Sequence, residues 1–207
     1  MKGILTRSPE PSEVQSSSAK LIEIDSREII HTAAFLVDGR HVVSGGDKGK
    51  IRRWRVEDGM EVGAPMDAGS AVYNIAVSRD GKWIVSGRWQ SVQVWSAESG
   101  ERVSEFKGHS HRVRAIDVSP NSTKIASGAG DNIICVWSLS TGQRLLGPWN
   151  HGGDVVAVKF SHDGRLIATT TWKSIYLDLR HSERQPCRQL SNSSLTLAQS
   201  LPRLVEQ

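Results

Sequence analysis

The chain has 207 residues, of which 38% are hydrophobic and 23% are charged, a composition that allows a packed core and excludes wholesale disorder. No apolar run approaches the ~18 residues of a membrane span, and the first residues, MKGILTRSPE, lack the roughly 7 to 15 apolar residues of a secretory signal. We therefore expect an intracellular protein, cytoplasmic or nuclear, that has no membrane partner.

The net charge of +4 is mild for a nucleic-acid-binding protein, although the sequence pI is about 9.3. The densest basic cluster is KGKIRRWR at residues 48–55, which contains Arg52. It could meet phosphates or an acidic partner, but in a strand such side chains more often solvate an exposed rim, so nucleic acid is the disfavoured partner. The two cysteines, Cys135 and Cys187, form no CxxC pair, which favours a reducing compartment.

In chain order, the sequence opens with residues 1–19, which are rich in Ser, Pro and Glu and are expected to be disordered. The stretch KLIEIDS at 20–26 aligns with the last strand of a repeat. Four related segments follow, and they end at Trp54, Trp95, Trp137 and Asp178, spaced 41, 42 and 41 residues apart. This periodicity predicts a repeat array over 20–180, with repeats of about 20–58, 59–99, 100–141 and 142–180.

Each repeat contains three short runs in which apolar and polar residues alternate, which is typical of strands. The same hairpin turn recurs at Asp38-Gly39, Asp80-Gly81, Asn121-Ser122 and Asp163-Gly164, where left-handed backbone suits these residue types. A glycine-led segment between repeats offers a fourth, shorter strand. Four antiparallel strands per unit of ~42 residues predict an all-β fold of stacked β-propeller blades.

The third repeat carries the most specific residues. Gly108-His109 is followed by VSP, IASG, Asp131 and the pair VW at 136–137, and this series resembles a WD repeat of the β-transducin kind. The stretches SGGDKGKIRRW and STGQRLLGP also resemble WD-repeat proteins common in fungi. The resemblance implies a structural tetrad of His109, Ser127, Asp131 and Trp137, in which the polar groups satisfy one another inside the blade.

The other repeats depart from that pattern. The residues that remain as partial tetrads are Ser44, Trp54, Ser86, Trp95, His151 and Thr169. The first repeat has Lys48 in place of the Asp and Ser26 in place of the His, and the fourth has Asp178 in place of the tryptophan. Losing the indole removes a large buried side chain, so we expect the fourth blade to be the least stable.

The grouping of a Ser, a His and an Asp also raises the alternative of a hydrolase triad, and His109-x-His111 that of a zinc site. No exposed nucleophile on a strained turn and no further metal ligand is evident, so we expect no catalytic residue, no metal and no cofactor. We expect His109 to be structural and His111 to be a solvent-facing loop residue.

SGRWQSVQVW and TTTWKSIYLD align without a gap and place Trp89 and Trp172 three residues after the tetrad Ser or Thr. These indoles either project onto one rim and anchor a partner, or fold inward to fill the space of the missing Asp. With His111, Arg112 and Arg52 they make up the candidate partner-binding residues.

Four blades are few for a family whose propellers mostly have seven or more, so we expect an incomplete, open propeller whose exposed blade faces invite self-association. Residues 181–207 lack the glycine-led strand and are expected to form an irregular or disordered tail. The sequence therefore predicts a non-catalytic scaffold that binds other proteins through rim loops. The alternatives are a truncated fragment that must associate with further blades and a basic nucleic-acid-binding surface around 48–55.

Overall fold

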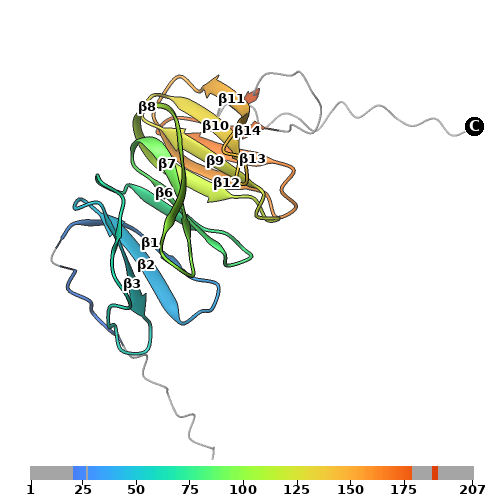
Figure 1. The fold of residues 1–207 in the computed structure, drawn as a ribbon. Coiled ribbons are helices and arrows are strands. Elements are labelled where there is room, and N and C mark those ends of the chain that lie inside the picture. The colour runs from blue at the N-terminus through green and yellow to red at the C-terminus, as the bar shows by residue number, and fades with distance from the viewer. Residues whose placement is uncertain (1–20, 27, 179–187, 191–207) are drawn as a thin grey trace, which may run out of the picture.

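The computed structural model describes residues 21–26, 28–178 and 188–190, and their regular structure consists of β-strands (Figure 1). The strands are β1 (Ile30–Phe35), β2 (His41–Gly46), β3 (Lys50–Arg55), β4 (Met66–Asp67), β5 (Asn74–Val77), β6 (Trp83–Gly87), β7 (Trp89–Ser96), β8 (Arg102–Val118), β9 (Lys124–Ala129), β10 (Ile133–Ser138), β11 (Arg144–Asn150), β12 (Val155–Phe160), β13 (Ile167–Thr171), β14 (Ile175–Asp178) and β15 (Arg188–Leu190). All neighbouring strands pair antiparallel.

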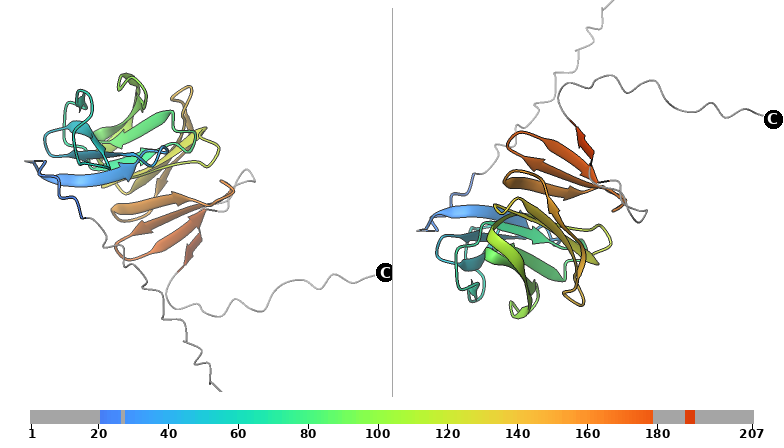
Figure 2. Two further views of the ribbon diagram at one scale, coloured as in Figure 1. Left: turned by 90° about the horizontal axis from the view of Figure 1, so that it is seen from below. Right: turned by 90° about the horizontal axis from the view of Figure 1, so that it is seen from above.

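These strands form four blades of four strands each. Strand β8 has 17 residues and belongs to two blades, because its first half pairs with β7 and its second half with β9. Blade 1 is β1–β4, blade 2 is β5–β7 with the first half of β8, blade 3 is the second half of β8 with β9–β11, and blade 4 is β12–β15. The blades follow one another around an arc with blades 1 and 4 at its ends (Figure 2). The expected all-β fold of four-stranded blades in an open propeller is confirmed.

The hairpin turns between the first two strands of each blade use the residues that the sequence singled out. The side chains of Asp38, Asp80 and Asp163 each accept a hydrogen bond from the backbone N–H two residues on, at 2.8, 3.1 and 3.0 Å. The following glycines have φ between +63° and +72°, the left-handed backbone that glycine adopts without strain. Local chemistry therefore fixes where each inner strand reverses.

The core lies between the blades. Each blade has a forward face, toward the next blade in the chain, and a backward face, toward the preceding one. Between blades 2 and 3, for example, buried Val85, Val92 and Phe106 of the forward face meet Val113 and Trp137 of the backward face. Two similar apolar clusters join blades 1 and 2 and blades 3 and 4. Burial of these side chains is what stacks the blades.

Two segments differ from expectation. Residues 21–26 contain no strand, and Ile22 and Ile24 lie against Gly59 of blade 1 instead of reaching blade 4. Within the tail that we expected to be irregular or disordered over 181–207, the described residues Arg188–Leu190 form β15, which pairs with β14 and gives blade 4 its fourth strand. The rest of that tail and residues 1–19 lie outside the described residues. The described part of the chain contains no helix long and apolar enough to cross a membrane.

Candidate protein-binding face

The candidate residues gather at one end of the blades, which we call the rim face. It consists of the turns between the second and third strands of each blade and of the links that lead from one blade to the next. Because β6 and β13 both run toward this end, the turns that follow them place Trp89 and Trp172 on the same face. The tetrad residues His109 and Asp131 lie at its edge, on the link within β8 and on the turn after β9.

The structure brings the four residues of the blade 3 tetrad together. The Ser127 Oγ accepts a hydrogen bond from Trp137 Nε1 at 2.8 Å and lies 2.8 Å from His109 Nε2. The His109 Nδ1 lies 3.2 Å from Asp131 Oδ2, which also accepts the Ser110 N–H at 2.7 Å. Burial lowers the pKa of His109, against the opposing effect of Asp131, which favours the neutral ring whose Nε2 can accept from the serine hydroxyl.

This geometry gives Ser127 a structural role. Ser127 is fully buried, and its Oγ already accepts a hydrogen bond from the indole N–H of Trp137. A nucleophilic serine needs an oxygen that a substrate can reach, together with donors placed for the developing oxyanion. The tetrad therefore joins the strands of blade 3 to the link that carries His109.

Blades 1 and 2 keep the indole half of the tetrad. Trp54 Nε1 donates to Ser44 at 2.7 Å, and Trp95 Nε1 donates to Ser86 at 2.9 Å. In blade 1 the buried carboxylate of Glu28, which the sequence analysis did not single out, lies beside Lys48, the residue in place of the tetrad Asp. The Glu28 side chain is 1% exposed and accepts hydrogen bonds from Arg52 Nε at 3.1 Å and from the backbone N–H of Lys48 at 3.2 Å. The only sequence signal for Glu28 is its position two residues after Ser26.

Blade 4 holds a different arrangement. His151 and Thr169 are both buried, as their tetrad positions require. The ring of Tyr176 lies against His151, with centroids 4.2 Å apart, and its hydroxyl donates to the His151 carbonyl at 2.7 Å. Among the described residues, the Thr169 hydroxyl has no hydrogen-bond partner. Blade 4 therefore lacks the serine–indole bond that the other three blades share.

The basic cluster at 48–55 is largely neutralised. Lys50 pairs with Asp67 at 2.7 Å, Arg52 pairs with Glu61 at 2.8 Å as well as with Glu28, and Arg55 pairs with Asp58 at 3.1 Å. Arg53 donates to the Ala97 carbonyl across the joint with blade 2. These cations are committed to neighbours within the protein, so the cluster offers little free charge to a phosphate backbone.

The two rim tryptophans point outward. Trp172 is 72% exposed and Trp89 is 45% exposed, which argues against indoles that fold inward to fill a missing Asp. His111 differs from the expected solvent-facing loop residue, because it lies in β8 and is half-buried. Its ring packs against Trp89, with centroids 4.9 Å apart, and a side chain at Gly130 would collide with it. Arg112 lies over the ring of Tyr73 at 5.9 Å.

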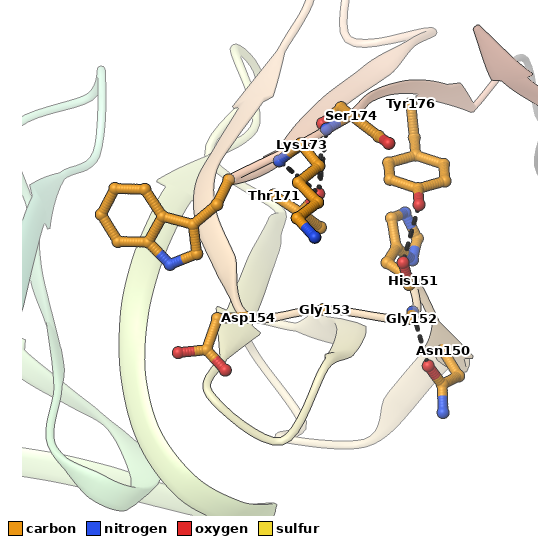
Figure 3. Close-up of a pocket in the computed structure, with 10 residues that line it drawn as sticks. Asn150, His151, Gly152, Gly153, Asp154, Thr171, Lys173, Ser174 and Tyr176 are labelled. Carbon is orange, nitrogen blue, oxygen red and sulfur yellow. Dashed lines mark hydrogen bonds between the residues drawn. The ribbon is translucent and has the colours of Figure 1, made fainter. Parts of the chain in front are cut away.

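A hollow lies beside each rim tryptophan. The hollow on blade 4 has a volume of about 710 Å³. It is lined by residues of two loops, namely Asn150, His151, Gly152, Gly153 and Asp154 and, facing them, Thr171, Trp172, Lys173, Ser174 and Tyr176 (Figure 3). The hollow beside Trp89 has a volume of about 370 Å³, and Arg88, Glu105 and Lys107 line it. No group of three or more His, Cys, Asp or Glu side chains in the described ranges is placed to hold a metal ion.

Comparison with known families decides the assignment. Residues 66–96, 100–138 and 144–177 match the family model of the WD domain, G-beta repeat, and together they make up half of the chain. The chain belongs to the WD40-repeat family. The WD40 matches begin at Met66, the first residue of β4, whereas the first three strands of blade 1, with the Glu28–Arg52 pair, lie before them.

The WD40 chain is similar to fungal translation proteins. It is 40% identical over 104 residues to eukaryotic translation initiation factor 3 subunit I of Neurospora crassa, covering 50% of this chain and 30% of the relative. The same subunit of Botryotinia fuckeliana is 36% identical over 109 residues, covering 52% and 32%. The chain thus spans about a third of the length of the curated relatives it matches.

Solved structures agree on the fold. The WD40 repeats of RRP9 superpose with a TM-score of 0.72 at 19% identity, covering 81% of this chain and 52% of that one. The structure of U3-55K gives a TM-score of 0.70 at 20% identity, covering 79% and 52%. At this level of identity the likeness supports the WD40 propeller fold alone.

Proposed function

We propose that this WD40 chain is a non-catalytic scaffold that binds another protein through its rim face, with Trp89 and Trp172 as anchors. The observation that carries the proposal is the pair of exposed indoles at equivalent positions of alternate blades, each beside a hollow. Large aromatic side chains dominate the energetics of protein interfaces, and water-exposed indoles gain most when a partner covers them.

The charges beside the indoles favour an acidic partner segment. Lys107 lines the hollow of Trp89 and Lys173 lines the hollow of Trp172, and within the described residues neither forms an ion pair with a carboxylate. Asp154, the carboxylate of the blade 4 hollow, lies 3.6 Å from Arg114. A segment with apolar side chains for the indoles and carboxylates for the lysines would complement both hollows.

The fungal relatives are named as subunits of a multi-subunit translation factor, which supports a role within a larger assembly. On this proposal the chain works inside the cell, and its residues 20–180 act as the binding unit between flanking segments 1–19 and 181–207. The alternative, a propeller fragment that recruits further blades, would require exposed blade faces on which another blade can pack.

The experiment compares proteins captured from eukaryotic cell extract by the tagged wild-type chain and by the Trp89→Ala/Trp172→Ala variant. We expect a defined set of partners that the variant loses while its thermal unfolding is unchanged. The matched control is Leu145→Ala, because Leu145 is 45% exposed, as Trp89 is, but lies on the outer strand β11. Partners that survive loss of both indoles would refute the rim anchors. Loss of binding in Lys107→Glu/Lys173→Glu tests the acidic segment separately.

A further inference from the structure

The three joints between blades are built alike, and glycine is their first component. Gly45, Gly87 and Gly128 each lie on a forward face, opposite a valine that begins the next blade. A Cβ at Gly45 would lie 2.7 Å from Val72 Cγ1, and one at Gly87 would lie 2.6 Å from the Val113 carbonyl oxygen and 3.0 Å from Val113 Cγ1. Carbon atoms pack at about 3.5–4.0 Å. At Gly128 the approach to Val155 is closer still. Each joint therefore needs a residue without a side chain.

The second component is a side-chain oxygen on the inner strand. The Thr32 hydroxyl of blade 1 accepts the Ile75 N–H at 3.0 Å, and the Asn74 amide oxygen of blade 2 accepts the Ile116 N–H at 3.2 Å. In blade 3 the accepting side chain is Asp117, whose carboxylate accepts the Phe160 N–H at 2.7 Å. These bonds satisfy backbone donors at the inner edge of the following blade.

Blade 4 has lost both components. Its register places Thr170 opposite Ala157 and Ile175, as Gly128 lies opposite Ala115 and Ile134, so a threonine stands where the glycine is needed. The positions of the accepting oxygens are taken by Ala157, which has no side-chain oxygen, and by Lys159, whose ammonium donates to Asp117 of blade 3 at 3.0 Å. Neither can accept a backbone N–H.

The apolar part of the forward face is nevertheless retained. Ile175 is 55% exposed and Leu177 is 37% exposed, at the positions where Ile134 and Val136 of blade 3 are buried. At the other end of the arc, Ile30 takes the place of the joint valine on the backward face of blade 1. Isoleucine is larger than valine, so the two ends of neighbouring copies would meet with Ile30 directed at Thr170.

We propose that Thr170, Ala157 and Lys159 close the exposed face of blade 4 to any further blade of this type, including blade 1 of a second copy. An open arc with exposed apolar faces would otherwise join head to tail into rings or filaments. On this proposal the forward face of blade 4 offers no joint to a further blade, which weakens the alternative of a fragment that recruits blades at this face. The inference is independent of the rim-face function.

The test places a threonine, the residue at position 170 of blade 4, at the glycine position of an existing joint. In Gly128→Thr we expect blade 4 to undock, so that amide hydrogen exchange of β12 and β13 rises by about 10-fold or more while blades 1 and 2 keep their protection. The control Thr170→Gly makes the reverse change where no joint exists, and it should leave the exchange of β12 unchanged. Should Gly128→Thr fail to fold, Gly45→Thr applies the same test at the first joint. Unchanged exchange in these variants would overturn the proposal.

The second arm is the oligomeric state of the wild-type chain, measured by size-exclusion chromatography with light scattering across its soluble range. We expect no association that depends on the open faces, so Leu177→Asp on blade 4 and Phe35→Asp on blade 1 should leave the mass unchanged. A dimer that each of these substitutions returns to monomer would show that blade 4 accepts blade 1, and the proposal would be wrong.

Discussion

The contribution of the complete tetrad can be isolated by comparing two serines. Ser127 joins two buried groups, Trp137 Nε1 and His109 Nε2, whereas Ser86 of blade 2 bonds only to Trp95 Nε1 among the residues that the structure describes. Leaving a buried polar group without its partner costs about 1–3 kcal/mol. Ser86→Ala should therefore lower the free energy of unfolding by about 1–3 kcal/mol, and Ser127→Ala by about 2–6 kcal/mol.

The assay is urea denaturation at neutral pH, followed by tryptophan fluorescence and by circular dichroism so that coincidence of the two transitions can be checked. Ser44→Ala supplies a second single-bond control, because Ser44 accepts only from Trp54 among the described residues. Equal losses in Ser127→Ala and in the two controls would refute the reasoning, since the histidine arm of the tetrad would then contribute nothing.

Three further predictions concern single groups. Burial lowers the pKa of His109 below its usual value of about 6.5, so the unfolded chain binds the proton first, and the free energy of unfolding should fall as pH drops below about 6.5. Urea midpoints between about pH 7.5 and pH 5 check this slope, which His109→Gln should reduce. Burial raises the pKa of Cys135 to about 11, so in a Cys187→Ser background the thiol should react with a disulfide reagent at about pH 8 only after unfolding; a fast reaction of the folded chain would contradict this. Thr169→Val removes a buried hydroxyl without a described partner and should raise the free energy of unfolding by about 1 kcal/mol in the same denaturation assay, whereas a loss would reveal a missing bond.

The features that the sequence predicted well are local ones. Asp80 and Gly81 make their turn with their own neighbours, so their residue types were sufficient to place it. Ser127 and Trp137 lie on strands that pair directly, and the resemblance to a WD repeat implied them as tetrad residues. Glu28 was missed because its partner Arg52 is 24 positions away and the pair forms only once blade 1 exists. Strand β15 was missed because three residues carry no alternating pattern.

The prediction that His111 faces solvent was wrong because its burial depends on contacts at the rim face between two blades. The alternation of apolar and polar residues along a strand indicates which face of the strand is buried against a neighbouring blade. It does not indicate which side chains in the turns of two different blades will contact each other. Trp89 belongs to blade 2 and Gly130 to blade 3, and both border His111. Only the arrangement of the two blades determines this contact.

The tetrad and the rim face are mechanically connected through the link within β8. Asp131 of blade 3 accepts the Ser110 N–H at 2.7 Å, and the Gln90 side chain of blade 2 donates to the Ser110 carbonyl at 3.1 Å. His111 follows directly, so the ring that supports Trp89 is held from both blades. Trp172 has no such support in the described structure and is more exposed, at 72% against 45%. The tetrad of blade 3 therefore preorganises Trp89, and a partner that uses both indoles loses less conformational entropy at Trp89 than at Trp172.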